Sequence, residues 1–336
     1  MSNVFQRVIV FGSNSFTGSH FINYLLEHTD AEVCGISRSR EYDPVMLPYL
    51  YKKPANSRYN FHQLNVNNDL PEILKVCDSF KPDAVVNFAA QGEVRNSWQW
   101  PEDWYETNCL AVVRLSTELA KRNYLKRYVA ISTPEVYGST ARGLKECHEY
   151  APSTPYGASK LAGDLHLMAL HKRHGFPVVF TRAANLYGIH QQLYRIIPRT
   201  VIYAKMGRVI TLHGGGKAER AFIHARDVAD ATWQVLQRGC NGEVYHLSPQ
   251  NELRTIHSVV KLVLKKAGAD FEDMVVLQEE NYGQDERFSI DGSKMAMELG
   301  WQPRVRFEDG VSETVEWIDE NWNDIAKREL AYVHLR

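Results

Sequence analysis

The chain has 336 residues, of which 44% are hydrophobic and 24% charged, a composition that suits one large globular unit or two closely packed domains. Its 39 Lys and Arg residues balance 40 Asp and Glu residues, and the resulting net charge of −1 disfavours bulk binding to nucleic acid or to a membrane surface. Five scattered cysteines without CxxC spacing predict reduced thiols, and the lack of a signal-peptide pattern or of a membrane-length apolar run favours the cytoplasm.

Short β-branched runs alternate with amphipathic stretches through the first half of the chain. The predicted strands are Arg7–Phe11, Glu32–Ile36, Phe61–Val66, Ala84–Phe88, Arg127–Ser132 and Val178–Thr181. The predicted helices are Phe16–Glu27, Leu70–Phe80, Trp104–Arg122 and Pro155–His174. Apolar strands that are separated by helices form a parallel sheet covered on both faces, and crossovers are right-handed. The pattern therefore predicts an α/β fold with a Rossmann-type, doubly wound parallel sheet.

After Arg182 the rhythm changes to glycine-containing loops and short helices such as Thr255–Ala267. The segment Phe222–Gln237 has the pattern of a strand fragment and a helix that return to the first domain. We therefore expect a large domain of residues 1–181 plus about 222–250. A smaller, discontinuous α/β domain of residues 182–221 plus about 251–336 would close over the carboxyl edge of the sheet.

A glycine-containing turn, Gly12-Ser-Asn-Ser15-Phe-Thr-Gly18, lies between the first predicted strand and the first helix. Such a turn directs backbone N–H groups at a helix N-terminus toward a pyrophosphate, and the helix dipole favours the negative charge. A glycine pair also fits an ordinary strand–helix turn, but the βαβ context favours a dinucleotide. Contacts are expected from Gly12, Ser15, Phe16 and Gly18.

The end of the second predicted strand carries Ser37, Arg38 and Arg40 and lacks the acidic residue that would bind the adenine-side ribose hydroxyls. Arginine beside a hydroxyl suits a 2′-phosphate, and the alternative is a solvated basic loop. NADP is therefore the first choice of cofactor and NAD the second.

Tyr156 and Lys160 stand at i and i+4 on one predicted helix, so a phenol and an ammonium share a helix face. A nearby cation lowers the pKa of a tyrosine, which prepares the phenol to take a proton from a substrate hydroxyl. The bare pair is common by chance. Here it follows five predicted strands and comes after a hydroxyl residue, Thr133, at the end of the fifth, which makes it a candidate catalytic pair.

Several motifs together resemble the nucleotide-sugar branch of the extended short-chain dehydrogenases/reductases, and most of all the NDP-glucose (dTDP-glucose-type) 4,6-dehydratases. They are a GxxGxxG-like turn with Ser15 in place of the middle glycine, Asn87–Ala90, Pro101–Asn108, Ser132–Gly138, Pro152–Lys160, Asn185–Gly188, Gly214–His224, Gly283–Asp291 and Leu299–Pro303. The similarity covers nearly the whole chain. It implies that the large domain binds the dinucleotide and the smaller one binds a nucleotide sugar.

The resemblance also implies residue roles. Thr133 would bind the 4-hydroxyl of the sugar, Tyr156 would deprotonate it, and Lys160 would hold the cofactor and tune Tyr156. Further implied cofactor contacts are Asn65, Val66 and Ala89. Implied substrate contacts are Gln91, Asn185, Arg195, Ile196, Thr211, His213, Arg220, Asn251, Asp285 and Arg287. No metal is implied, and the helices Trp104–Arg122 and Pro155–His174 would form the four-helix seam of a homodimer.

Glu135 favours dehydration over simple epimerisation. Oxidation at C4 makes the C5 proton acidic, and a carboxylate two residues beyond Thr133 would remove it before water leaves C6 and hydride returns. The product would be an NDP-4-keto-6-deoxyhexose. Pro134 stands where the glucose dehydratases carry an aspartate acid, so Glu135 acts as both base and acid, another group or water supplies the proton, or the reaction differs.

The alternatives within the family are a nucleotide-sugar epimerase and an NDP-uronate decarboxylase. A non-catalytic dinucleotide or nucleotide-sugar sensor is disfavoured, because Thr133, Tyr156 and Lys160 are all present.

Overall fold

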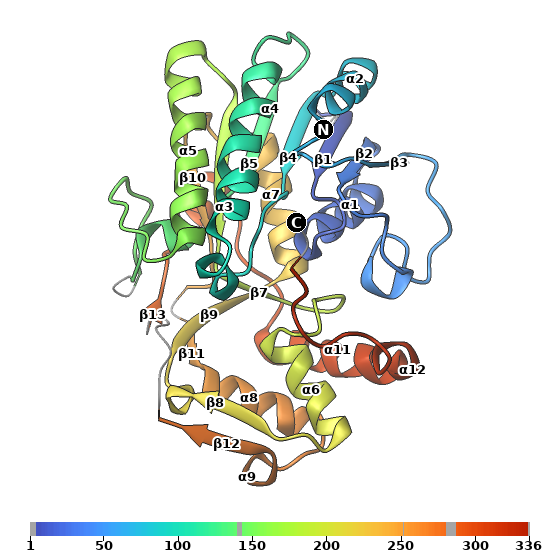
Figure 1. Cartoon of the computed structure of the whole chain (residues 1–336), viewed down its shortest axis with the longest axis vertical. Coiled ribbons are helices and arrows are strands. Elements are labelled where there is room, and N and C mark those ends of the chain that lie inside the picture. Colours follow the sequence, from blue (N-terminus) through green and yellow to red (C-terminus); the bar gives the residue numbers. More distant parts are fainter. Residues whose placement is uncertain (1–4, 140–142, 251, 280–286, 335–336) are drawn as a thin grey trace.

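The computed structural model describes residues 5–139, 143–250, 252–279 and 287–334. Its larger layer contains the strands β1 (Arg7–Phe11), β2 (Glu32–Ser37), β3 (Tyr59–Gln63), β4 (Ala84–Asn87), β5 (Arg127–Ile131), β6 (Val178–Ala183) and β10 (Val244–Leu247). They form a seven-stranded sheet in the order β10-β6-β5-β4-β1-β2-β3, with parallel pairing throughout (Figure 1). The order reverses at β1, so a crevice opens where the carboxyl ends of β1 and β4 diverge.

Helices cover both faces of this sheet: α1 (Phe16–His28), α2 (Leu70–Phe80), α3 (Pro101–Tyr105), α4 (Ala111–Leu119), α5 (Pro155–His174) and α7 (Ala225–Arg238). Alternate residues of β1 point to opposite faces. Val8 and Val10 pack into the apolar cluster on the side of α1 and α7, whereas Ile9 and Phe11 pack into the cluster on the side of α2, α4 and α5. A strand that is buried on both faces reads as a continuous apolar run. The predicted doubly wound sheet is confirmed.

Two predicted elements differ from the structure. The third strand was placed at Phe61–Val66, but β3 spans Tyr59–Gln63, because Asn65 already begins a turn in which its N–H donates to Asp69 Oδ2 at 2.7 Å. The helix expected from Trp104 begins at Pro101 and contains a π-helical segment, η3 (Glu106–Leu110), between α3 and α4. Gly163 of α5 fits against this segment, where a Cβ would lie 2.4 Å from the Asn108 carbonyl oxygen.

The smaller layer lies beyond the carboxyl ends of the large sheet (Figure 1). A mixed sheet holds β7 (Asn185–Tyr187), β9 (Glu219–His224), β11 (Leu253–Thr255) and β13 (Arg287–Phe288), and a two-stranded sheet holds β8 (Ile210–His213) and β12 (Val275–Gln278). The helices are α6 (Ile196–Met206), α8 (Ile256–Lys266), α9 (Phe271–Met274), α10 (Ser293–Leu299), α11 (Phe307–Glu320) and α12 (Trp322–Ile325). One apolar cluster joins α6, α8 and α11 through Val201, Val259 and Val311.

Between these two parts the chain returns to the large sheet, because α7 packs beside α1 and β10 pairs with β6. The residue limits of the two domains stay a prediction. Within the described ranges, no helix is both long and apolar enough to cross a lipid bilayer.

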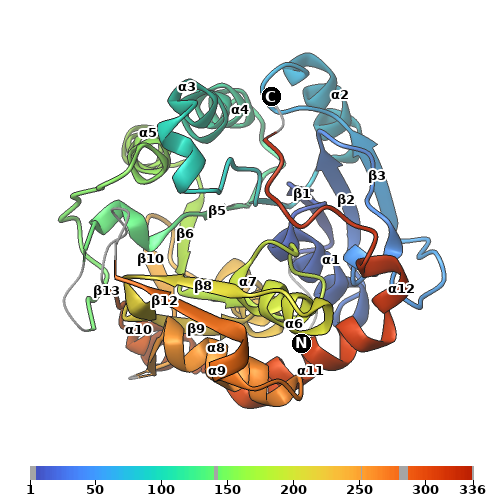
Figure 2. The same ribbon diagram turned by 60° about the horizontal axis from the view of Figure 1, so that its bottom comes forward.

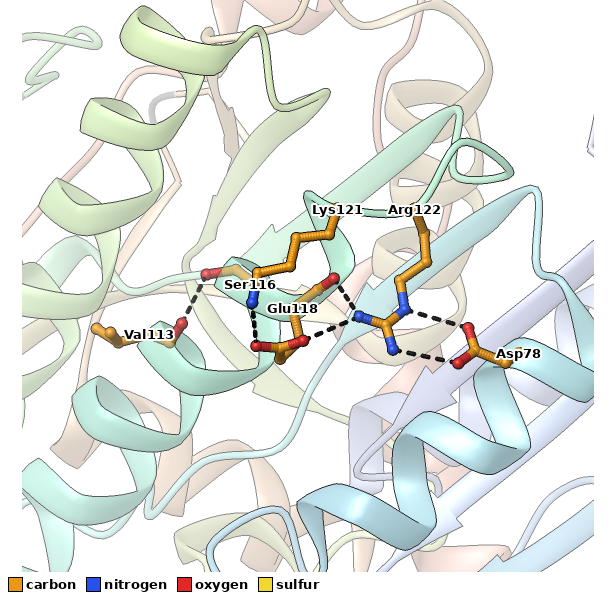
Figure 3. Close-up of polar contacts among 6 residues, drawn as sticks. All are labelled: Asp78, Val113, Ser116, Glu118, Lys121 and Arg122. Carbon is orange, nitrogen blue, oxygen red and sulfur yellow. Dashed lines mark hydrogen bonds and ion pairs between the residues drawn. The ribbon is translucent and has the colours of Figure 1, made fainter.

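A polar clamp fixes the end of α4 against α2 (Figure 3). Arg122 donates from Nε and Nη2 to the two carboxylate oxygens of Asp78, both at 3.1 Å, and also from Nη1 to Glu118. The two-pronged contact with Asp78 raises the pKa of Arg122 further above its ordinary value and lowers the pKa of Asp78. The Asp78 carboxylate of this clamp lies at the surface, with its side chain 50% exposed.

Candidate active site

The glycine-containing turn between β1 and α1 is built for close backbone packing. Gly12 has φ +73°, and a Cβ there would lie 2.6 Å from the Ala89 nitrogen. A Cβ at Gly18 would lie 2.4 Å from the Gly12 oxygen. Ser15 is the N-cap of α1, and its Oγ accepts the Gly18 N–H at 3.0 Å, which explains why serine replaces the middle glycine. The first turn of α1 has no acidic residue and so favours an anion.

The adjoining end of β2 holds polar groups that suit the adenosine half of a dinucleotide. Ser37 is buried, and its Oγ accepts the Asn14 N–H at 3.0 Å. The Asn14 amide donates to the backbone carbonyls of Ser39 and Arg40, at 3.0 and 2.8 Å. Within the described part of the chain, the buried Oδ1 of Asn14 has no hydrogen-bond partner and is available to a ligand hydroxyl. Asn14 was not predicted, although it lies inside the turn motif.

The other expected cofactor contacts lie at the same edge of the sheet. Ala89 follows β4, and its N–H donates to Asn87 Oδ1 at 3.0 Å. Asn65 and Val66 form the turn after β3, where Asn65 Oδ1 accepts the Asn67 N–H at 3.0 Å. The donor set and the tight glycine turn together fit a dinucleotide.

Two N-capped elements bring the predicted catalytic residues together. Thr133 caps the 3₁₀ turn η4 (Pro134–Tyr137), and Thr154 caps α5, where its Oγ1 accepts the Gly157 N–H at 3.0 Å. The first turn of α5 packs tightly on η4, because a Cβ at Gly157 would lie 2.8 Å from the Glu135 oxygen. As a result, the Thr133 hydroxyl hydrogen-bonds to the Tyr156 phenol. One turn further along α5, the buried Lys160 donates from Nζ to the Ile131 carbonyl at 2.8 Å.

The electrostatics of Tyr156 differ from the sequence-based expectation. Burial of the phenol raises its pKa above the ordinary value, and the nearby charge of Glu135 raises it further, whereas the hydrogen bond from Thr133 and the charge of Arg195 lower it. Burial also lowers the pKa of Lys160, against the opposing charge of Asp164. Lys160 Nζ donates a hydrogen bond to the Ile131 carbonyl. The positive charge of Lys160 does not offset the effects that raise the pKa of Tyr156. The expected lowering of the Tyr156 pKa by Lys160 is therefore wrong, because the pKa of Tyr156 is raised above its ordinary value.

A buried polar network behind these residues was not predicted. Oδ2 of Asp164 accepts the Ser132 hydroxyl at 2.5 Å and Nη2 of Arg182 at 3.1 Å. Arg182 also donates to the Tyr137 hydroxyl at 2.5 Å, and this hydroxyl lies 2.8 Å from Nε2 of His246. The only sequence signal for this network is the position of Asp164, one helical turn after Lys160.

The predicted substrate residues come mostly from the smaller layer. Asn185 lies on β7, Arg195 is the N-cap of α6 with its guanidinium over the Tyr194 ring, and Ile196 begins that helix. The positive charge of Arg195 lowers the pKa of Tyr156, so Arg195 lies near the phenol. Arg220 is buried on β9.

The remaining predicted substrate residues differ in exposure, and some fall outside the described part of the chain. Thr211 and His213 lie exposed on β8. Gln91 is buried and exchanges two backbone hydrogen bonds with the Asn108 amide, at 2.9 and 3.0 Å. Asn251 and Asp285 fall outside the described residues. Only the backbone of Arg287 is described: it lies in β13 and pairs with Glu219 of β9.

Comparisons with known proteins identify the family of the chain. The profile of the GDP-mannose 4,6 dehydratase family matches residues 9–314. The dTDP-glucose 4,6-dehydratase of Streptomyces niveus is 40% identical over 322 residues, covering 94% of both chains. That of Haemophilus influenzae is 32% identical and covers 93% of this chain and 97% of its own.

Among solved structures, the dTDP-glucose 4,6-dehydratase of Streptomyces venezuelae with NAD and TYD bound is similar. It has a TM-score of 0.87 and 31% identity, and the match covers 95% of this chain and 98% of that one. A UDP-glucose 4-epimerase of Thermotoga maritima has a TM-score of 0.84 at 23% identity, covering 94% of this chain and 100% of that one, and shows the shared fold alone.

Proposed function

The chain belongs to the GDP-mannose 4,6 dehydratase family and is an NAD(P)-dependent nucleotide-sugar 4,6-dehydratase, and on this premise we propose how its residues perform the reaction. The observation that carries the proposal is the convergence of Thr133, Tyr156 and Glu135 where α5 packs on η4. When bound, NAD(P) would supply the reversible transfer of a hydride, from C4 of the hexose and back to C6.

Tyr156 takes the proton of the 4-hydroxyl. The Thr133 hydroxyl, already bonded to the phenol, orients the sugar oxygen for this transfer. Lys160, whose Nζ donates to the Ile131 carbonyl, would hold the ribose hydroxyls of the cofactor. Arg220 pairs with the pyrophosphate of the nucleotide sugar, and Arg195 and Asn185 contact its nucleotide.

Glu135 removes the C5 proton once C4 is a ketone. Pro134 carries no proton to donate, so the same carboxyl group delivers the proton to the C6 hydroxyl as it leaves as water. Hydride then returns to C6, and C5 receives a proton from Tyr156 or from solvent. Two protons leave the sugar, from O4 and C5, and two are consumed, by the leaving hydroxyl and at C5, so the cycle balances and yields a 4-keto-6-deoxyhexose.

We further propose a choice of cofactor, an oligomeric state and a cellular location. Arg38 and Ser37 support NADP, whereas the solved dTDP-glucose 4,6-dehydratases of Streptomyces venezuelae and Bacillus anthracis contain NAD, so the two cofactors have to be compared directly. A homodimer through α3, η3, α4 and α5 is supported by large apolar side chains exposed along these elements: Tyr105 (40%), Leu110 (44%) and Leu165 (48%). A cytoplasmic location stays a prediction.

The test is NMR of the products in D₂O, with a panel of dTDP-, UDP-, CDP- and GDP-hexoses led by dTDP-glucose, the substrate named for the relatives. We expect a C6 methyl signal and one solvent deuterium at C5. Glu135→Gln should abolish deuterium exchange at C5. Exchange that continues undiminished in this variant rejects Glu135 as the base.

The same spectra distinguish the alternatives. A retained CH₂OH with inverted stereochemistry at C4 identifies an epimerase, and release of CO₂ from an NDP-uronate identifies a decarboxylase.

A further inference from the structure

The C-terminal segment Arg328–His334, called the strap here, leaves the smaller layer after α12 and returns to the nucleotide-binding layer. In Figure 2 it runs from α12 in front of β1 and β2 toward α3 and α4. Its start is fixed by an ion pair, because Arg328 Nη2 lies 2.7 Å from Oδ2 of Asp43 in the loop after β2. The strap thus begins beside the end of the cleft that is expected to hold the adenosine.

The far end of the strap is anchored in an aromatic slot. The His334 ring stacks on Trp100, with centroids 4.6 Å apart and planes 5° apart, and on Trp104, with centroids 5.2 Å apart and planes 12° apart. Its Nε2 lies 2.7 Å from Oδ2 of Asp103, which lies between the two tryptophans in the sequence. The His334 side chain is only 6% exposed, whereas its neighbour Val333 is 60% exposed. One enclosed side chain in an otherwise irregular segment indicates specific docking.

The middle of the strap lies among the residues that are expected to bind the two nucleotides. The Tyr332 ring packs edge-on against Tyr194, with centroids 5.6 Å apart. Charges that act on the Tyr332 phenol come from Glu93, Arg38 and Arg195. Arg38 is the expected reader of the cofactor's adenine-side ribose, and Arg195 also acts on Tyr156. Tyr332 therefore packs on the neighbour of Arg195 and lies within reach of the Arg38 charge.

We propose that the strap closes over the dinucleotide cleft and retains the cofactor, with His334 as its latch and Tyr332 as its contact with Tyr194. This inference rests on the proposed function. A 4,6-dehydratase returns its hydride within each turnover, so the dinucleotide has no need to leave the cleft between cycles. A segment that joins Asp43, Tyr194 and the Trp100–Trp104 slot slows dissociation without hindering the chemistry.

Docking is tested first, on the full chain without added ligand. Trypsin cleaves after Arg328 only when the strap is released, and intact mass reports the loss of residues 329–336. His334→Ala should be cut about tenfold faster than the natural sequence, because it empties the aromatic slot. Val333→Ala is the matched control, since its exposed side chain contributes nothing to the slot, and it should be cut at the natural rate. Equal rates for the natural sequence and both variants overturn docking.

Retention is tested by loading the same proteins with NADH or NADPH and chasing with excess oxidised dinucleotide, while the fluorescence of the released cofactor is followed. We expect His334→Ala and Tyr332→Ala to release it about tenfold faster than Val333→Ala. Equal release rates overturn the retaining role even where docking holds. If the chain binds neither dinucleotide, both the proposed function and the retaining role are wrong. The proteolysis experiment tests only whether the strap is docked.

Discussion

Arg182 and Asp164 form an ion pair inside the protein, with Nη2 of the arginine 3.1 Å from Oδ2 of the aspartate and side chains 0% and 5% exposed. The same oxygen accepts the hydroxyl of Ser132, the residue before Thr133. Asp164 also follows Lys160 by one helical turn. The pair therefore joins β5, α5 and β6 directly behind the residues that are expected to carry the reaction.

Replacing Asp164 by asparagine should lower the free energy of unfolding by about 3–5 kcal/mol, because the Arg182 guanidinium then stays buried without its counter-charge. Asp78→Asn is the matched control. It removes the exposed carboxylate of the Arg122 clamp in Figure 3, where we expect a loss below about 1 kcal/mol. Urea unfolding of both variants measures the difference. Similar losses would show that the buried pair contributes no more than a surface one.

The parts of the fold that the sequence predicts are those with local causes. The turn from Gly12 to Gly18 and the capped start of α5 are each specified within a few residues, and both elements lie where the sequence predicts them. The convergence with Thr133 follows because the carboxyl ends of parallel strands share one edge of the sheet.

The features that sequence reasoning missed are long-range. Asp103 and His334 are 231 positions apart, and nothing near either residue indicates their contact. The pairing of Ser132, Asp164 and Arg182 depends on how α5 lies on β5 and β6. The π-helical segment at Glu106–Leu110 has no distinct composition. The lowered Tyr156 pKa was expected from spacing to Lys160 alone, whereas the effects of burial and of the Glu135 charge became apparent only in three dimensions.

Tyr156→Phe should reduce turnover at least about a thousandfold while the Kd for the nucleotide sugar changes less than about twofold. The variant loses only the group that we propose accepts the proton of the 4-hydroxyl, and general-base contributions reach this size. Rapid-mix product analysis and titration calorimetry measure the two quantities. Tyr203→Phe on α6 is the control and should retain full activity. Turnover within tenfold of the natural sequence in Tyr156→Phe removes the phenol from the mechanism.

Arg38→Ala should weaken NADPH binding about tenfold or more and NADH binding less than about threefold, because only NADPH carries the 2′-phosphate that a guanidinium pairs with. Arg40→Ala, two positions further along the same loop, is the comparison and should affect both cofactors equally. Fluorescence titration with each reduced dinucleotide supplies one pair of Kd values for the natural sequence and one for each variant. A symmetric loss in Arg38→Ala would assign this arginine a general phosphate role and leave NAD as the cofactor.

Lowering the pH from 7.5 to 5.5 should destabilise the protein through its buried histidines. Burial lowers the pKa of His190 to about 4 and those of His224 and His246 to about 3, with further lowering by neighbouring positive charges. Below the ordinary histidine pKa of about 6.5 the unfolded chain therefore binds protons that the folded chain does not. This stabilisation is complete above that value and is lost as the pH falls, by about 1.4 kcal/mol per histidine at pH 5.5.

Glu146 and Asp227, whose pKa values burial raises, act in the opposite sense and mainly at lower pH. His190→Asn removes the contribution of one histidine to the pH dependence of stability. Asparagine is chosen because it tolerates the left-handed backbone at this position, where φ is +66°. Urea unfolding across this pH range should give the variant a smaller loss than the natural sequence, by about the contribution of one histidine. Parallel pH profiles for the two proteins would show that His190 titrates alike in the folded and unfolded chains.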